Sequence, residues 1–294
     1  MKEGIALKRL LCFLLLPLLL LPMTGVLASA EAFSVSEALT DEQLRTVCSN
    51  FGVSVDGGFV QTVSTEEENQ CFDGLSAVLP EESERVYCVY ARALSRGDGL
   101  EVRTSNIRAV SDILLSSVLL TAGVTDAQIY VGAPYSVSGI AVPAEIFSAC
   151  AAIGQTVSET EKKAAVTELT LARSLMTDSG TYDVLLLLND RKQTAGKTAS
   201  LSDAELLDSI TQAAEKRKVS LTESQRDELL ALCRLYESLD TSALKRSAGA
   251  FEKTLNTLNT QENGGALTRW VGRMAASLAE KCESLLDDLI NKVL

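Results

Sequence analysis

The sequence predicts an α+β protein in which a ferredoxin-like split βαββαβ sheet domain is followed by a mostly α-helical bundle region. Segments rich in β-branched and aromatic residues occur between residues 59 and 133, whereas the pattern after residue 158 is helical throughout. Serine or threonine followed three positions later by glutamate or glutamine marks the helix starts. We therefore expect a signal peptide at 1–30, an α+β domain at 31–157 and a helical region at 158–294.

Four segments are predicted to form an antiparallel sheet, and they are Phe59–Val63, Arg85–Leu94, Leu100–Thr104 and Gln128–Ala133. The loop 95–99, with two glycines, predicts a hairpin between the second and third strands. Helices at 65–75 and 108–122 complete the split order, and two right-handed crossovers place both on one face of the sheet. The other face then needs an apolar cover, which the helix at 40–51 or the helix at 139–153 can supply.

Five helix starts fit the capping box, in which the cap side chain and the side chain three residues on each accept a hydrogen bond from the other residue's amide. They are Thr40/Gln43, Thr65/Glu68, Ser158/Glu161, Ser202/Glu205 and Thr222/Gln225. The helical region is predicted to contain Ser158–Met176, Tyr182–Leu188, Ser202–Lys218, Thr222–Leu239, Ser242–Leu258 and Leu267–Val293, with a polar loop at 193–200. The apolar stripe of the last helix predicts packing within the bundle or, alternatively, a surface for another protein or a second copy.

The first 30 residues have the three parts of a cleavable secretory signal. Lys2, Lys8 and Arg9 form the positive region, residues 10–21 are apolar, and 28–30 are small residues before a cut. Because the apolar run is shorter than the roughly 20 residues that a membrane-spanning helix needs, cleavage after Ala30 is expected rather than anchoring. The protein is thus predicted to be secreted or extracellular, associated with the cell envelope, and in a membrane only during export.

The negative charge of the remaining chain disfavours nucleic acids and anionic membrane surfaces as partners. The whole sequence has a net charge of −12, and the leader contains three basic residues and one acidic residue, so the rest of the chain carries −14. Nucleic acids bind through clusters of lysine and arginine. We therefore expect no nucleic-acid partner, and the expected partners are another envelope protein or a cell-wall component.

Cysteine usage leaves two interpretations open. Six of the seven cysteines follow the leader, an even number in a compartment where disulfides persist. However, Cys48 shares a helical face with Leu44 and Val47, and Cys233 shares one with Leu229, which is typical of a small buried hydrophobic residue. The chain has no Cys-x-x-Cys pair, so neither a thiol redox motif nor a zinc site is indicated.

The chain contains no histidine. This excludes Ser-His-Asp and Cys-His catalysis and nearly all zinc and copper sites. An enzyme with this sequence would have to use carboxylates, lysine, tyrosine, serine or threonine. No catalytic residue, metal ligand or cofactor is predicted.

The candidate ligand-binding residues lie at the ends of two predicted strands, and they are Pro134, Tyr135, Ser136, Ser138, Gly139, Thr104 and Asn106. The first five lie before a predicted helix, where hydroxyl and amide groups can hold a carboxylate or phosphate. The structural alternative is that Ser138 is only the helix N-cap and Gly139 permits a tight turn. Thr104 and Asn106 are either ligand contacts or a polar cap for the helix that starts near Arg108.

Several short blocks carry a resemblance to a known family. They are Leu39-Thr40 with Gln43 and Phe51-Gly52-Val53, then Thr104-Ser105-Asn106-Ile107, then Thr121-Ala122-Gly123-Val124-Thr125-Asp126-Ala127, and Ala133-Pro134-Tyr135-Ser136-Val137-Ser138-Gly139. In order and spacing they resemble the bacterial exported family known only as domain of unknown function 1002, over about residues 35–240. The resemblance implies that the protein is exported by a Gram-positive bacterium. It implies no particular activity, because the family has none assigned. Residues 140–143 and the helix from Leu244 depart from the family pattern.

The sequence thus predicts an exported cell-envelope or extracellular protein of unknown biochemical role, a non-enzymatic binding or interaction protein that uses its sheet face or its long helices. The alternative is a histidine-free hydrolase or transferase that acts on an envelope polymer through carboxylates. Two or more Asp, Glu, Lys or Tyr side chains with shifted pKa values in one cleft would favour the enzyme.

Overall fold

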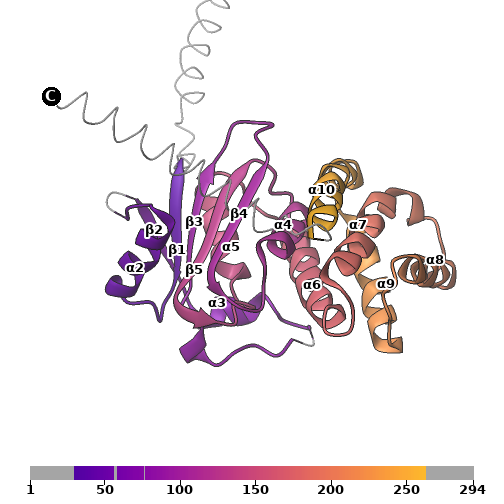
Figure 1. Ribbon diagram of the computed structural model, residues 1–294, viewed down its shortest axis with the longest axis horizontal. Helices are drawn as coiled ribbons and strands as arrows, with labels where there is room; N and C mark the ends of the chain where they lie inside the picture. Colours follow the sequence, from indigo (N-terminus) through magenta and orange to yellow (C-terminus); the bar gives the residue numbers. More distant parts are fainter. Residues whose placement is uncertain (1–29, 56–57, 76, 263–294) are drawn as a thin grey trace, which may run out of the picture.

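The computed structural model describes residues 30–55, 58–75 and 77–262. The predicted leader up to residue 29 and the predicted helix Leu267–Val293 lie outside the described residues. Figure 1 shows a central sheet with α2 (Asp41–Phe51) on one side and the helical region on the other. Within the described ranges, no helix combines the length and the apolar character needed to cross a membrane.

Five strands form one mixed sheet in the order β2-β1-β3-β5-β4. They are β1 (Glu31–Ser36), β2 (Phe59–Val63), β3 (Cys88–Ala93), β4 (Leu100–Ile107) and β5 (Ala127–Val137). β1 is parallel to β2, β4 is parallel to β5, and the central β3 is antiparallel to both of its neighbours, β1 and β5. The protein is therefore α+β, as predicted, but its sheet is mixed rather than antiparallel.

The strand order differs from the expected ferredoxin-like arrangement because the sheet has an additional strand and lacks the expected hairpin. β1 is absent from the four predicted strands, and it lies between β2 and β3. β5 separates β3 from β4, so the loop 94–99 passes over the start of β5. There the amides of Gly97 and Gly99 donate to Asp126 Oδ1 at 2.8 and 3.1 Å, and the Leu94 amide donates to the Asp126 carbonyl.

Two apolar layers enclose the sheet. On one face, α2 packs its buried residues Leu44, Val47 and Cys48 against β1, β3 and β5. The other face carries Val89, Ala91, Ile129 and Val131, and it is covered by α4 (Asp112–Thr121) and α5 (Pro143–Ala152). Of the two helices expected as candidates for the second face, the one at 40–51 covers it, whereas the one expected at 139–153 begins only at Pro143 and lies on the same side as α4.

Four of the five predicted capping boxes are present as expected, at the starts of α2, α6, α8 and α9. The fifth lies one residue earlier, because Ser64 and Glu67 form the box that begins α3 (Thr65–Gln70). The helical region contains α6 (Glu159–Leu175), α7 (Thr181–Thr198), α8 (Asp203–Lys216), α9 (Glu223–Ser238) and α10 (Thr241–Glu262). The predicted loop at 193–200 is wrong, since α7 continues through most of it, with Ala195 and Thr198 buried.

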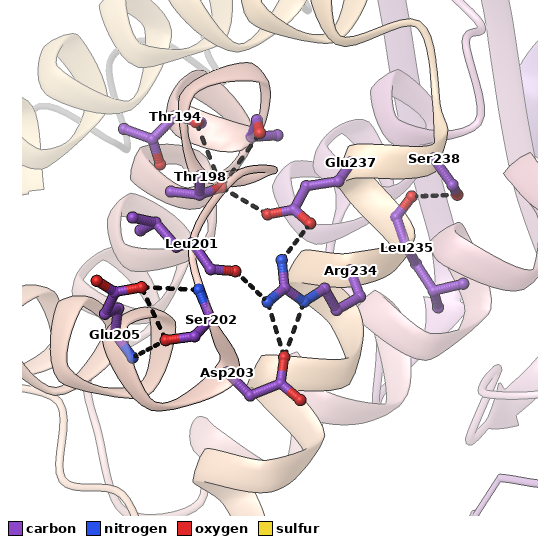
Figure 2. A network of polar contacts seen from close by, with 11 residues as sticks. Thr194, Thr198, Leu201, Ser202, Asp203, Glu205, Arg234, Leu235, Glu237 and Ser238 are labelled. Carbon is purple, nitrogen blue, oxygen red and sulfur yellow. Dashed lines mark hydrogen bonds and ion pairs between the residues drawn. The ribbon is translucent and has the colours of Figure 1, made fainter.

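Arg234 of α9 ties the neighbouring helix ends together (Figure 2). Its guanidinium donates to Asp203 at the start of α8, to the Leu201 carbonyl before that helix, and to Glu237 one turn further along α9. Glu237 also accepts a hydrogen bond of 2.7 Å from Thr198 at the end of α7. Each of the three guanidinium nitrogens donates to a residue at one of these helix ends, so the network positions the helices relative to one another.

A second polar network lies inside the core and joins the helical region to the sheet layer. Lys192 of α7 is 2 % exposed, and its Nζ lies 2.7 Å from Glu168 Oε1 of α6 and 2.9 Å from both the carbonyl and the Oγ of Ser117 in α4. Glu168 also accepts hydrogen bonds from the hydroxyl groups of Ser117, Thr121 and Tyr236. All three ammonium donors and both carboxylate oxygens are thus satisfied, as a buried ion pair requires.

Candidate functional site

A cavity of about 560 Å³ lies where α3, α5 and the start of α6 meet. Its walls include the apolar side chains of Leu75, Phe147 and Val157, and its polar lining includes both acids and bases. Cavities of several hundred Å³ are typical of sites for small ligands or short segments. Because its walls combine apolar side chains with acids and bases, this cavity is the candidate site for a ligand.

Two helix starts, those of α3 and α6, contribute the charged residues at the rim of this cavity. Ser64 begins α3, and its amide and hydroxyl both lie 2.8 Å from the Glu67 carboxylate. The backbone hydrogen bond from Ser64 is the first cause that lowers the pKa of Glu67. At the start of α6, Lys162 Nζ lies 2.7 Å from Glu159, and the neighbouring Lys163 is exposed. The rim therefore carries a carboxylate at the start of α3 and ammonium groups at the start of α6.

Cys71 follows α3 and lines the cavity. Burial raises the pKa of its thiol to about 11, and the nearby ammonium of Lys162 only partly opposes that shift. Because the thiolate is the nucleophile, a cysteine in this state is unreactive at neutral pH. Cys71 is thus suited to packing against a ligand rather than to attacking it.

A pair of buried carboxyl groups, Glu68 and Glu145, lies on the sheet side of α3 and α5. Their exposed fractions are 1 % and 0 %, and neither lines the cavity. Burial, followed by the neighbouring carboxyl of Glu68, raises the pKa of Glu145 well above its usual range. Burial also raises the pKa of Glu68, although the Arg85 guanidinium opposes that shift. Both shifts favour the protonated form, most strongly at Glu145.

The surroundings of the carboxyl pair hold it in place. Ser36 Oγ donates to Glu145 Oε1 at 2.8 Å, and the Tyr87 amide donates to the same Ser36 oxygen at 2.9 Å. Arg85 lies 3.4 Å from Glu68 Oε2 and donates to Asn69 Oδ1 at 2.7 Å. The pair is therefore attached to β1, to the residues before β3 and to α3, and no substrate atom can reach it in this conformation.

The predicted ligand residues lie together at one irregularity between β4 and β5. The pairing Ser105 with Gly132 is followed by Ile107 with Val137, so residues 133–136 bulge opposite Asn106 alone. Asn106 has a φ of 62°, and its Nδ2 donates to the Ala133 carbonyl at 2.9 Å. This bulge contains Pro134, Tyr135 and Ser136, and the Tyr135 side chain is 47 % exposed.

Two hydrogen bonds connect the bulge to neighbouring segments. The Arg108 guanidinium donates to the Ser136 carbonyl at 2.7 Å, and the Tyr135 hydroxyl donates to the Ser83 carbonyl at 3.0 Å. Thr104 Oγ1 donates to Asp112 Oδ1 at 2.6 Å. Asp112 is the first residue of α4, and burial raises the pKa of its carboxyl group. These contacts explain Thr104 and Asn106 structurally, and a ligand role for the bulge stays a prediction.

No helix starts at Ser138 and Gly139, contrary to the expectation that led to the proposed anion site. The N-cap of α5 is Val142, and the Ser138 carbonyl instead accepts a hydrogen bond from the Ala109 amide. Gly139 has a φ of 80°, and its Cα faces Ile107 so closely that a side chain would collide with it. The anion site at a helix start is therefore not formed by these two residues.

The cavity and the carboxyl pair were not predicted, because nothing in the local sequence distinguishes their members. Lys162 and Lys163 have the pattern of an ordinary exposed helix turn, and Glu145 follows Pro143 and Ala144 as an acidic residue normally does in a first helical turn. A signal exists only for Glu68, which lies in the run of three glutamates. In the described part of the chain, no cluster of three or more metal-ligating side chains occurs.

Comparison with known proteins places the chain in a family. The family model described as "Protein of unknown function (DUF1002)" matches residues 36–256. The uncharacterized protein YpuA of Bacillus subtilis (strain 168) is 31 % identical over 147 residues, which are 49 % of this chain and 51 % of YpuA, so the chain spans about half the length of this curated relative. No solved structure matches the chain. Because the family model covers most of its length, this protein belongs to the family of proteins of unknown function DUF1002.

Proposed function

We propose that this protein is exported and binds a peptide segment of the cell envelope, from the cell wall or from another envelope protein, in the cavity between α3, α5 and α6. The observation that carries the proposal is the combination of an apolar wall with a rim of both charges in a cavity of about 560 Å³. Peptides present carboxylate, ammonium and amide groups beside small apolar groups, and the lining offers a partner for each. The strongly acidic remainder of the chain disfavours polyphosphate ligands instead.

Two features support export. The first 30 residues have the charged, apolar and small-residue parts of a cleavable signal. The first strand of the sheet, β1, begins at Glu31, directly after the proposed cut. Removal of the leader therefore keeps all five strands, and at the end of the β1–β3 pair it removes one hydrogen bond, from the Ala93 amide to the Ala30 carbonyl.

Binding is favoured over hydrolysis because the pair of carboxyl groups whose pKa values are raised together, Glu68 and Glu145, is closed to solvent. A general acid or base must come within hydrogen-bonding distance of the group on which it acts. The cavity itself offers Cys71, whose raised pKa keeps it as a thiol. A hydrolase that used this carboxyl pair would require α3 or α5 to move away from the sheet.

The binding test uses the chain from Glu31 onward and two probes: insoluble peptidoglycan from a Gram-positive bacterium, and a detergent extract of its envelope proteins on beads. The double variant Lys162→Ala/Lys163→Ala removes the positive rim, and Ala151→Trp fills the cavity from its exposed lining. We expect co-sedimentation of the unaltered chain with one of the probes and at least a tenfold loss for both variants. The probe that retains the chain identifies the source of the peptide.

The control double variant Lys245→Ala/Lys253→Ala removes the same charge from exposed positions of α10. It should leave co-sedimentation unchanged, which separates the cavity rim from net charge. Equal binding by all variants, or binding by none of the proteins, would contradict the proposed site. For export, expression of the full-length chain in a Gram-positive host should give extracellular protein whose amino terminus is Glu31.

A further inference from the structure

The apolar layer between α2 and the sheet contains two cysteines, Cys48 of α2 and Cys88 of β3. Their exposed fractions are 2 % and 0 %, and both belong to the same cluster of packed side chains as Phe33 and Tyr90. Both are free thiols in the structure. They come from segments 40 residues apart, so their proximity is a property of the tertiary fold.

The backbone explains why these two residues meet. Gly132 of β5 is the direct partner of Cys88 across the antiparallel pair β3 and β5, so the two residues face the same side of the sheet. A Cβ at Gly132 would lie 2.6 Å from Val47 and 2.7 Å from Phe51, which shows that α2 rests directly on this glycine. Cys48 follows Val47 on the buried face of α2 and is thereby brought onto Cys88.

The two thiols lie in one cluster, and each shifts the pKa of the other. A hydrogen bond from Cys88 lowers the pKa of Cys48, and the same contact, followed by burial, raises the pKa of Cys88 well above its usual range. The remaining cysteines of the described ranges, Cys71, Cys150 and Cys233, differ in this respect. Burial is the first cause that raises the pKa of each, to about 11 or 12, and no second cysteine contributes to any of these shifts.

We propose that Cys48 and Cys88 form a disulfide bond when the chain folds in the presence of a disulfide oxidant, so that α2 becomes covalently attached to the central strand of the sheet. The inference does not depend on the cavity, and it applies to any compartment that supplies such an oxidant.

The chemistry is a two-step thiol–disulfide exchange. The Cys48 thiolate attacks one sulfur of the oxidant, the oxidant's S–S bond breaks, and the first leaving thiolate takes up the proton that Cys48 has lost. Cys88 then loses its proton and attacks the Cys48 sulfur of the mixed disulfide, which releases the second thiol. The two protein thiols lose two electrons in total, and one molecule of oxidant is reduced to two thiols.

Both sulfurs are enclosed once α2 has docked, so the exchange belongs to folding rather than to the finished structure. An oxidant reaches the pair only while α2 is detached from the sheet. After the bond has formed, residues 48 to 88 form a closed loop, so α2 stays attached to β3 even when the chain unfolds. A cross-link over a loop of this length restricts the unfolded chain and is expected to raise the Tm by about 10 °C.

The test is refolding of the chain from Glu31 onward out of denaturant, once in reduced glutathione alone and once in a mixture of oxidised and reduced glutathione. Peptide mapping without reduction should show one dominant linkage, Cys48 to Cys88, only after refolding in the mixture. The oxidised protein should have the higher Tm, and a reducing agent should abolish the difference. The native reduced protein, given the same mixture without denaturant, should oxidise at least tenfold more slowly.

Two single variants and one control complete the design. Cys48→Ser and Cys88→Ser should each lose the redox-dependent shift in Tm, whereas Cys150→Ser, which alters an equally buried thiol, should keep it. If a serine variant fails to refold, peptide mapping of the unaltered chain still decides the question. Free thiols at both positions after oxidative refolding, a different dominant linkage, or a Tm lowered by the Cys48–Cys88 bond would overturn the proposal.

Discussion

Lys192 and Glu168 form an ion pair of 2.7 Å at a point where the side chains are 2 % and 0 % exposed. The pair lies between α4, α6, α7 and α9, so it joins the helix that covers the sheet to the helices that follow. Burial lowers the pKa of Lys192, and the adjacent carboxylate opposes that shift. Removal of either partner would leave an uncompensated charge in the core.

The substitution Lys192→Met is therefore expected to lower the free energy of unfolding by about 3–5 kcal/mol. The matched control is Lys197→Met, because Lys197 is an exposed residue one to two turns further along the same helix. Its effect should stay within about 0.5 kcal/mol. Urea unfolding followed by circular dichroism gives both values. Equal effects of the two substitutions would mean that the ion pair does not hold the core together.

Glu145 should make the protein less stable as the pH rises. Its pKa is raised well above the ordinary value of 4.5, so between pH 4.5 and that raised pKa the folded chain holds a proton that the unfolded chain has lost. The free energy of unfolding then falls by about 1.4 kcal/mol per pH unit for each such proton. In Glu145→Gln this contribution is absent, and the variant should be more stable than the unaltered protein at pH 8 but not at pH 4.5.

Thermal unfolding between pH 4.5 and pH 8 measures this difference. Glu215→Gln serves as the control because Glu215 is exposed in α8. It should reproduce the pH dependence of the unaltered chain. If Glu145→Gln shows the same slope with pH as the control, the protonated state of Glu145 is wrong.

Gly132 is predicted to be required for the close approach of α2 to the sheet. Gly132→Ala places a methyl group 2.6 Å from Val47 Cγ1, so the helix must shift. We expect a loss of about 1–3 kcal/mol in the free energy of unfolding, as for other overpacked sites. Gly249→Ala, within α10 and with open space around its Cα, should instead stabilise the protein by about 0.5–1 kcal/mol. Opposite signs in chemical denaturation support the packing, and a neutral Gly132→Ala would refute it.

Asn106 tests whether the bulge between β4 and β5 is structural. Asn106 has a φ of 62°, and its side chain donates a hydrogen bond to the Ala133 carbonyl. Two substitutions separate the contribution of the backbone conformation from that of the hydrogen bond. Asn106→Ala loses the bond and strains the backbone, and should lower the free energy of unfolding by about 1–2 kcal/mol, whereas Asn106→Gly relieves the strain and should lower it less. Equal losses in urea unfolding would show that the backbone conformation contributes nothing.

The features predicted correctly from the sequence are those set by neighbouring residues. The pairs Thr40/Gln43 and Ser158/Glu161 specify a helix start within four residues, and the structure has a helix at each. By contrast, the position of β5 between β3 and β4 depends on which strand Cys88–Ala93 pairs with, and no local pattern contains that information. β1 is short, and its sequence alone does not reveal which side chains face each side of the sheet. The structure shows that Phe33 and Val35 face α2.

The candidate site was harder to predict for the same reason. The cavity combines two segments that are far apart in the sequence, 63–75 and 144–163, and no local pattern in either segment indicates a site. The composition of Gln193 and its neighbours predicts a loop, although tertiary packing keeps them in α7. Residues 134–139 are predicted to lie between a strand and a helix start, but 134–137 belong to β5 and the helix begins only at Pro143.

Hydrogen–deuterium exchange with soluble peptide fragments of the cell wall, and in a parallel series with peptides from envelope proteins, tests the proposed binding site most directly. Slower exchange is predicted in residues 64–73, 143–151 and 156–163, which surround the cavity, and it should disappear in Ala151→Trp. Protection confined to the bulge at 133–138, or no protection with either series, would contradict the assignment of the cavity as the ligand site.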